Sequence, residues 1–317
     1  MNSKLLGNSD MNITTIGLGT WAIGGNWQWG WGAQDDKESV DTIVKAIEAG
    51  INWIDTAAVY GLGHSEKIVG EAVKLVSNKP FIFTKCGLCW KENNPGRSAY
   101  PCLKSQSVRK EAENSLRRLA ADYIDLYQIH WPAPEGDIEE AWTEMVKLKE
   151  EGKVRWIGVS NHNVEQMERL KKIAPITSLQ PPHNLLNRSV EKEILPYCAS
   201  ENIGTIIYSP MASGLLSGKM SRERIASLPN EDWRKRDDNY VEPKLSRNLK
   251  LVEVLSDIAS IRGVTTAEIA IAWTLKNPAV TGAIVGMRKP QQVDELLKGA
   301  TVELTDEECG RIENFIP

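Results

Sequence analysis

The 317-residue sequence predicts an α/β protein, a single-domain (β/α)8 barrel that spans residues 1–317. Three observations predict this fold. Apolar, strand-like runs alternate with amphipathic helical runs along nearly the whole chain, and most connecting segments are short, which is typical of a parallel sheet. The inner strands are apolar on both faces, as a sheet covered by helices requires. A chain of this length is also often one domain when it is an α/β barrel.

The expected elements follow one another in a regular order. Ile16-Gly17-Leu18-Gly19 is the first strand, and after it Val40, Ile43, Val44 and Ile47 repeat with the spacing of one helical face. Further strands are expected at residues 52–56, 81–85, 123–130, 154–159, 177–180, 205–209 and 282–285. Further helices are expected at residues 65–76, 106–119, 138–151, 164–173, 190–201 and 246–261.

Two of the helix starts carry a capping signal. Asn163 with Gln166, and Thr305 with Glu308, have the spacing of an N-cap residue and its partner three positions later. Such a pair satisfies backbone N–H groups that a helix start would otherwise leave unpaired. The pattern therefore indicates that helices begin directly after Asn163 and Thr305.

A doubly wound open sheet fits the alternation of strands and helices equally well. Its dinucleotide-binding form needs a glycine-rich turn that leads from the first strand directly into a helix. The segment Gly17-x-Gly19-x-x-Ala22 is the one candidate, and no helical pattern begins until about Asp35. We therefore interpret these glycines as a loop at the mouth of a barrel.

Composition and charge exclude several classes of partner. Apolar residues make up 41% of the chain and charged residues 25%, as in ordinary globular proteins. The net charge of -4 leaves no basic surface for nucleic acid. No apolar run is long enough for a membrane span, and residues 1–12 are too polar for a secretory signal. Five cysteines at irregular spacing do not form a disulfide framework, so we expect a cytoplasmic protein.

Four polar residues stand at or just beyond the ends of strand-like runs. These are Asp55, Tyr60, Lys85 and His130. In a (β/α)8 barrel the C-terminal ends of the strands meet at one face, where active sites are built. We therefore expect the carboxylate, the phenol, the ammonium and the imidazole to converge on one point.

This combination of groups suits the reduction of a carbonyl. Hydride transfer to the carbonyl carbon places negative charge on the oxygen, which Tyr60 can protonate. A phenol is a weak acid at neutral pH, and we expect the ammonium of Lys85 to lower its pKa. Asp55 would keep the buried Lys85 charged, and His130 would donate a further hydrogen bond to the substrate oxygen.

Flanking segments extend the pattern in order from residue 13 to about residue 300. They are Gly17-Leu18-Gly19-Thr20-Trp21, Asp55-Thr56-Ala57-x-x-Tyr60-Gly61, Gly63-His64-Ser65-Glu66, Thr84-Lys85, Asp125-Leu126-Tyr127-Gln128-Ile129-His130-Trp131, Ile157-Gly158-Val159-Ser160-Asn161, Tyr208-Ser209-Pro210-Met211-Ala212-Ser213-Gly214-Leu215-Leu216-Ser217-Gly218-Lys219 and Gly286-Met287-Arg288-Lys289-Pro290-x-Gln292. With these segments the chain resembles the aldo-keto reductases. The resemblance implies a (β/α)8 barrel that uses NADPH, acts on a small-molecule carbonyl substrate, and has the four residues above as its catalytic positions.

The same resemblance implies a set of cofactor-binding residues. Ser160, Asn161 and Gln180 match groups that hold the nicotinamide carboxamide, and Tyr208 matches the ring stacked on the nicotinamide. Arg288 is a fixed cation suited to a 2′-phosphate, which favours NADPH over NADH. Leu296 stands where Asn is common in the family, which puts one adenine contact in doubt. The remaining implied residues are Gly19, Thr20, Trp21, Ser209, Pro210, Met211, Gly214, Leu215, Lys219, Gly286, Gln292 and Glu295.

Three loops are longer than α/β units need, at residues 20–36, 86–105 and 211–245. Such loops commonly shape substrate pockets. The chain has 11 tryptophans, and several of them fall in loops that follow the first, third and fourth strands. We expect an apolar or aromatic substrate pocket formed by Trp21, Trp27, Trp29, Trp90 and Trp131, with Trp31 near the same mouth.

The remaining candidate residues favour structural roles. Cys86 and Cys89 form a C-x-x-C pair in the loop after Lys85, but no four-ligand zinc set is present, so we interpret them as reduced thiols. We expect His162 and His183 to be structural and His64 to open a helix.

Two other functions fit the same residues. One is a dehydrogenase that oxidises polyols, sugars or inositols by the reverse reaction, although the tryptophan-rich loops argue mildly against polar substrates. The other is a regulatory subunit that binds the nicotinamide cofactor as a redox sensor, with negligible turnover. The chain shows no partner-binding tail, so we rank this function third.

Overall fold

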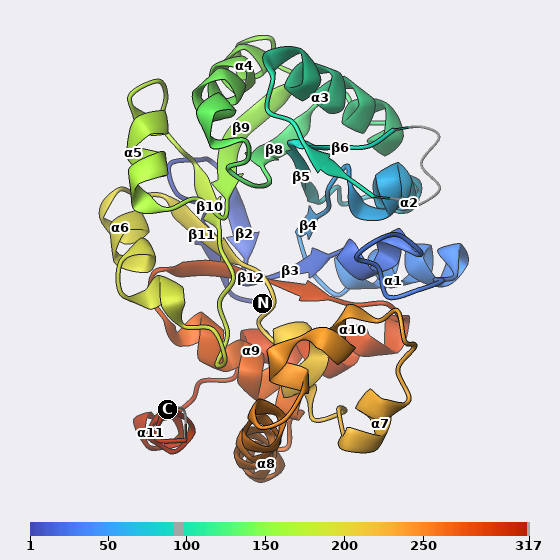
Figure 1. Cartoon of the computed structure of the whole chain (residues 1–317), viewed down its shortest axis with the longest axis vertical. Helices are drawn as coiled ribbons and strands as arrows, with labels where there is room; N and C mark the ends of the chain where they lie inside the picture. The colour runs from blue at the N-terminus through green and yellow to red at the C-terminus, as the bar shows by residue number, and fades with distance from the viewer. Residues whose placement is uncertain (92–97, 316–317) are drawn as a thin grey trace.

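The computed structural model of the chain describes residues 1–91 and 98–315. In these residues eight parallel strands close into a barrel, with helices around it (Figure 1). The strands of the barrel are, in order around it, β3 (Ile16–Gly19), β4 (Trp53–Asp55), β5 (Phe81–Cys86), β8 (Ile124–Ile129), β9 (Val154–Ser160), β10 (Ser178–Gln180), β11 (Gly204–Ile207) and β12 (Val280–Gly286). β12 pairs with β3 and closes the ring, which confirms the barrel and excludes the doubly wound sheet.

Helices follow the strands as the alternating pattern predicts. The helices are α1 (Asp36–Glu48), α2 (His64–Leu75), α3 (Ser105–Leu119), α4 (Ile138–Glu150), α5 (Val164–Lys171), α6 (Ile194–Ser200), α7 (Arg222–Ala226), α8 (Lys244–Arg262), α9 (Thr266–Lys276), α10 (Pro290–Leu296) and α11 (Asp306–Glu313). Both predicted capping signals are present, at the starts of α5 and α11. Among the described residues, no helix combines the length and the apolar character that crossing a membrane would require.

Several helical segments differ from the expectation, and the short helices α7 and α10 lie outside the expected ranges. α9 was not predicted, because residues from Ala267 to Thr274 are buried on every side and show no amphipathic period. The helix expected at residues 190–201 is interrupted, and it consists of the short 3₁₀ turn η4 (Ser189–Glu191) followed by α6. Pro196 lies in the first turn of α6, where its missing N–H is tolerated, but one continuous helix from residue 190 would need that N–H.

A hairpin at the N-terminus covers the end of the barrel where the strands begin. It consists of β1 (Ser3–Leu5) and β2 (Asn12–Thr14) in antiparallel pairing. Leu6 and Met11 from this hairpin pack inside the barrel with Trp53 and Phe83. The other buried members of this interior cluster are Ile13, Leu126, Ile206 and Ile284. The opposite end of the barrel, where the strands end, is therefore the one left for a site.

The glycines of the first strand do not form the loop that we expected. Gly17 lies inside β3, and a Cβ added there would come within 2.1 Å of the Trp53 ring. The absence of a side chain at this position therefore makes room for an indole inside the barrel. Gly19 ends the strand, so only this second glycine lies at the mouth.

The long loop 211–245 is folded rather than irregular. It contains η5 (Ala212–Ser217), α7, η6 (Trp233–Arg236) and η7 (Asp238–Tyr240). A small apolar cluster holds these turns together, and its buried members are Leu215, Met220, Ile225, Tyr240 and Leu245. The loop 86–105 contains the hairpin β6 (Leu88–Cys89) and β7 (Tyr100–Pro101), and its residues 92–97 lie outside the described residues.

Candidate active site

The four polar residues singled out from the sequence lie together where the barrel strands end. Asp55 is the last residue of β4, Lys85 lies near the end of β5, and His130 follows β8 directly. Tyr60 begins the 3₁₀ turn η2 (Tyr60–Gly63) in the loop after β4. The ring centres of Tyr60 and His130 are 5.9 Å apart, the rings are nearly perpendicular, and both residues line the same cavity.

Lys85 lies beneath Tyr60 and contacts both Tyr60 and Asp55. Its ammonium is almost completely buried and donates to Asp55 Oδ1 at 2.6 Å, to the Thr56 carbonyl at 2.9 Å and to Tyr60 Oη at 3.3 Å. An ammonium has three donors and no acceptor, so the phenol oxygen is the acceptor in the last contact. The hydroxyl proton of Tyr60 therefore remains free to be donated to another group.

The protonation states differ in part from the expectation. Burial raises the pKa of Tyr60 well above its usual value and the Asp55 carboxylate raises it further, so the phenol stays protonated at neutral pH. The expected lowering by Lys85 is not what sets this pKa. Burial also lowers the pKa of Lys85, while Asp55 opposes that effect. Burial, followed by the charge of Lys85, lowers the pKa of His130 well below 6.5, so its imidazole is neutral.

A second layer of hydrogen bonds holds the group in place. The Gln180 amide donates to Asp55 Oδ2 at 2.8 Å, so both carboxylate oxygens of Asp55 are engaged. Asn161 donates to the His130 carbonyl at 3.0 Å and accepts from the Tyr208 hydroxyl at 2.9 Å. The ends of β9, β10 and β11 are thus tied to those of β4 and β8.

Backbone strain is concentrated beside the same residues. Asn161, Ser209 and Ser213 adopt positive φ angles of 62°, 57° and 55°, in a region that non-glycine residues seldom occupy. All three line the pocket. Strain of this kind costs on the order of 1–3 kcal/mol per residue and persists where surrounding contacts enforce it.

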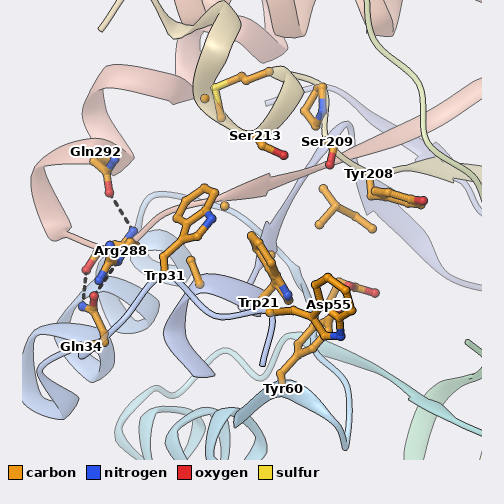
Figure 2. Close-up of a pocket in the computed structure, with 18 of the residues that line it drawn as sticks. Trp21, Trp31, Gln34, Asp55, Tyr60, Tyr208, Ser209, Ser213, Arg288 and Gln292 are labelled. Carbon is orange, nitrogen blue, oxygen red and sulfur yellow. Dashed lines mark hydrogen bonds between the residues drawn. The ribbon is translucent and has the colours of Figure 1, made fainter. Parts of the chain in front are cut away.

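The site opens into a cavity of about 1440 Å³ that runs across the end of the barrel. Asp55 and Tyr60 lie along it, and Arg288 and Gln292 lie at its far end (Figure 2). His130 also lines it. The other residues expected to contact cofactor or substrate that line it are Gly19, Trp21, Trp27, Trp29, Trp131, Ser160, Asn161, Gln180, Tyr208, Ser209, Pro210, Met211, Gly214, Lys219, Gly286 and Glu295.

Four residues expected at the site do not line the cavity. Lys85 lies beneath Tyr60, and Thr20 is buried, where its hydroxyl donates to the Asp55 carbonyl at 3.1 Å. Leu215 belongs to the apolar cluster of the loop 211–245. Trp90 was expected in the substrate pocket, but its ring packs against the Arg118 guanidinium at 5.7 Å. Trp90 follows β6 directly, and it packs against a residue of α3 rather than against the pocket.

The aromatic residues at the mouth differ in exposure. Trp27 is buried, and its ring centre is 6.0 Å from that of Tyr60. Trp29 and Trp131, which also line the cavity, are 50% and 44% exposed, so large apolar surface is accessible there. Exposed aromatic surface that lines a cavity is typical of a ligand pocket.

Sequence reasoning missed Gln34, Trp233 and Arg234, which line the cavity, and it placed Trp31 near the mouth without its contacts. Trp31 packs edge-on to Trp21 with ring centres 5.0 Å apart, and the Arg234 guanidinium lies 4.6 Å above the Trp31 ring. The length of the loops 20–36 and 211–245 was a signal, but it could not show that the two loops contact one another.

The cysteines and the other histidines lie outside this arrangement. All five cysteines are free, and burial raises the pKa of Cys86 well above its usual value and that of Cys89 to about 12. His162 is buried against the Ser160 carbonyl, His183 pairs with Glu191, and His64 begins α2. Within residues 1–91 and 98–315, no cluster of three or more metal-ligating side chains is found.

Comparisons with a family model, with known proteins and with solved structures all find similar proteins along nearly the whole chain. The model of the aldo/keto reductase family matches residues 15–317. The chain is 40% identical over 312 residues to aldo-keto reductase YhdN of Bacillus subtilis (strain 168), covering 97% of this chain and 92% of that protein. It is 34% identical over 313 residues to the NADH-specific methylglyoxal reductase of Escherichia coli (strain K12), covering 95% and 94%. The structure of a glycerol dehydrogenase from Gluconobacter oxydans superposes with a TM-score of 0.91 at 40% identity, covering 99% of this chain and 94% of that one.

Proposed function

The chain belongs to the aldo/keto reductase family, and on that premise we propose that it is an NADPH-dependent reductase of aldehydes, dicarbonyls or ketones. The observation that carries this proposal is the contact between Lys85 and Tyr60, which uses the phenol oxygen as an acceptor and leaves its proton to be donated into the cavity.

The residues around the phenol have separate roles in this proposal. A bound nicotinamide supplies the hydride. Tyr60 donates its proton to the carbonyl oxygen as negative charge develops there, and the ammonium of Lys85 stabilises the phenolate that remains. Asp55 keeps Lys85 charged, and Gln180 fixes Asp55 from the other side. The neutral imidazole of His130 orients the substrate oxygen by a hydrogen bond.

Features of the cavity support a nicotinamide dinucleotide along its length. A Cβ added to Gly286 would meet no atom closer than the Gly19 carbonyl at 4.0 Å, so this strand end is open to the cavity. Arg288 at the far end favours a 2′-phosphate, and this residue is the basis for preferring NADPH over NADH.

Replacement of Tyr60 by Phe tests the role of the phenol. We expect kcat for carbonyl reduction to fall by about 10²–10⁴, the typical effect of a positioned general acid, because only the proton donor is removed. The rate is followed by the loss of reduced-nicotinamide absorbance with aromatic, aliphatic and dicarbonyl substrates. Cofactor binding by the variant, measured separately, should match that of the wild type. Wild-type kcat in the variant would refute this role for Tyr60.

Oxidation of polyols is the second candidate function. The similarity to a glycerol dehydrogenase structure favours it, and the same proton donor can act as the base in the reverse direction. Oxidation of glycerol and larger polyols with NADP⁺ separates the candidates. A kcat/KM for polyols above that for every carbonyl tested would move the assignment to a dehydrogenase.

A further inference from the structure

The β3–α1 loop (residues 20–35) reaches across the far end of the cavity to the loop between β12 and α10. The guanidinium of Arg288 donates from Nε to Gln34 Oε1 at 2.7 Å and from Nη2 to the Ala33 carbonyl at 3.1 Å. Gln34 in turn donates from Nε2 to the Arg288 carbonyl at 3.0 Å, and dashed lines mark the hydrogen bonds between the two residues in Figure 2. The amide thus holds both the side chain and the backbone of Arg288.

Both partners of this guanidinium are uncharged. Among the described residues, Arg288 takes part in no ion pair, and three of its five N–H donors have no protein partner. The nearby carboxylate of Glu38 lies 3.6 Å from Lys289 Nζ and is shared with that cation. The positive charge of Arg288 is therefore aimed by Gln34 but not neutralised by it.

The charge of the residue at position 34 should decide what Arg288 can bind. A guanidinium fork with free donors suits a phosphate monoester, to which it can make two parallel, charge-assisted bonds. A carboxylate at the same place would neutralise the guanidinium and repel a phosphate, while a ribose 2′-hydroxyl would tolerate it as an acceptor. Glutamine and glutamate have nearly the same shape, but glutamate adds a negative charge and cannot donate to the Arg288 carbonyl as Gln34 Nε2 does. Gln34→Ala, which loses that donation without adding a charge, separates the two effects.

We propose that Gln34 determines the cofactor preference of this protein by keeping Arg288 oriented and charged for a 2′-phosphate. This inference rests on the proposed use of a nicotinamide dinucleotide with its adenosine end at Arg288. It assigns cofactor selectivity to a residue 254 positions away from Arg288 in the chain. Because the Gln34 amide is neutral, it orients Arg288 without repelling the 2′-phosphate.

The test is the binding of NADPH and NADH to Gln34→Glu, measured by isothermal titration calorimetry. We expect the Kd for NADPH to rise about tenfold or more, because a charge-assisted contact is replaced by repulsion. The Kd for NADH should stay within about threefold, because its 2′-hydroxyl carries no charge. Gln34→Ala, which removes the clamp without adding charge, should weaken NADPH binding less than Gln34→Glu. Glu38→Gln should lower the Kd for NADPH, because Lys289 then loses its carboxylate partner and its positive charge is no longer neutralised.

Gln28→Glu is the matched control for charge. Gln28 is an exposed residue of the same loop and accepts from the Ala99 N–H at 3.4 Å, and it does not line the cavity. This variant should leave the ratio of the two Kd values unchanged. Equal weakening of NADPH and NADH in Gln34→Glu, or an unchanged ratio, would overturn the inference. Because binding is measured without turnover, a wild type that binds both cofactors and converts no carbonyl would refute the proposed activity alone.

Discussion

The ammonium of Lys85 is almost entirely out of water, and its stability depends on one carboxylate. Lys85 and Asp55 are 1% and 2% exposed and lie 2.6 Å apart. A buried ion that loses its partner pays the full cost of desolvation, whereas a pair replaced by neutral groups does not. The ion pair that the barrel must keep buried is thus also part of the proposed catalytic group, which would couple the stability of the barrel to the proposed chemistry.

Asp55→Asn should therefore lower the free energy of unfolding by about 3–5 kcal/mol, because the buried Lys85 must either keep its charge without a carboxylate partner or give up its proton. Urea unfolding followed by tryptophan fluorescence measures the loss. The double variant Asp55→Asn/Lys85→Met should recover most of it, since both charges are then absent. Asp41→Asn, which removes the exposed pair with Lys37, is the control and should leave the stability nearly unchanged, because water screens that pair. A double variant as unstable as the single one would show that the ion pair is not the cause.

At the scale of elements, the segment that leaves β5 is anchored to α3 by a buried carboxyl group. Glu111 accepts from the Gly87 N–H at 3.0 Å and from the Ser107 hydroxyl at 3.2 Å. Burial raises the pKa of Glu111 to about 7, against an ordinary value of 4.5. This anchor lies directly beyond Lys85 in the chain, so it helps to place the end of β5.

The titration of Glu111 makes the stability of this anchor depend on pH. Between about pH 4.5 and pH 7 the folded state holds a proton that the unfolded state releases, so the contribution of Glu111 to stability rises as the pH falls through this range. Above pH 7 the carboxylate of Glu111 is charged, and the full free-energy cost of burying that charge destabilises the folded state. A rise in the pKa of Glu111 from 4.5 to about 7 corresponds to a loss of about 3 kcal/mol in the free energy of unfolding once the carboxylate is charged.

Glu111→Gln should accordingly stabilise the protein at pH 8, by up to about 3 kcal/mol, because the amide is never charged. The gain should shrink as the pH is lowered and vanish near pH 4.5. Thermal melting between pH 5 and pH 8.5 measures it. Glu113→Gln, on the exposed side of the same helix, should instead leave the stability nearly unchanged, because it loses only a solvent-screened contact with Lys153. A loss of stability at pH 8 in Glu111→Gln would contradict this account.

At the scale of the whole molecule, the N-terminal hairpin completes the interior of the barrel. Leu6 has no exposed surface and packs with Trp53, Phe83 and Met11. Trp53 is fixed further by a hydrogen bond from its indole N–H to the Thr14 carbonyl at 2.8 Å. The hairpin closes the end of the barrel opposite to the cavity, so its packing supports the strands that carry the site.

Leu6→Ala should lower the free energy of unfolding by about 2–5 kcal/mol, because it leaves a cavity among close-packed side chains. Urea unfolding measures this effect, with the interior Trp53 as one of the fluorescent probes. The neighbouring Leu5 is 57% exposed, so Leu5→Ala should change the stability by less than about 0.5 kcal/mol. Equal effects of the two substitutions would show that the hairpin does not pack as the structure describes.

Local patterns in the sequence were enough to predict the barrel, the order of its strands, most of its helices, and the convergence of Asp55, Tyr60, Lys85 and His130. These features follow from local periodicity and from the rule that parallel strands end at one face. The folded molecule was needed to show that Gln34 binds Arg288, that Gln180 holds Asp55, and that Trp90 packs against Arg118 away from the cavity. Such contacts join loops or strand ends that are far apart in the chain, and their geometry depends on how the whole barrel sets those ends, which no local pattern encodes.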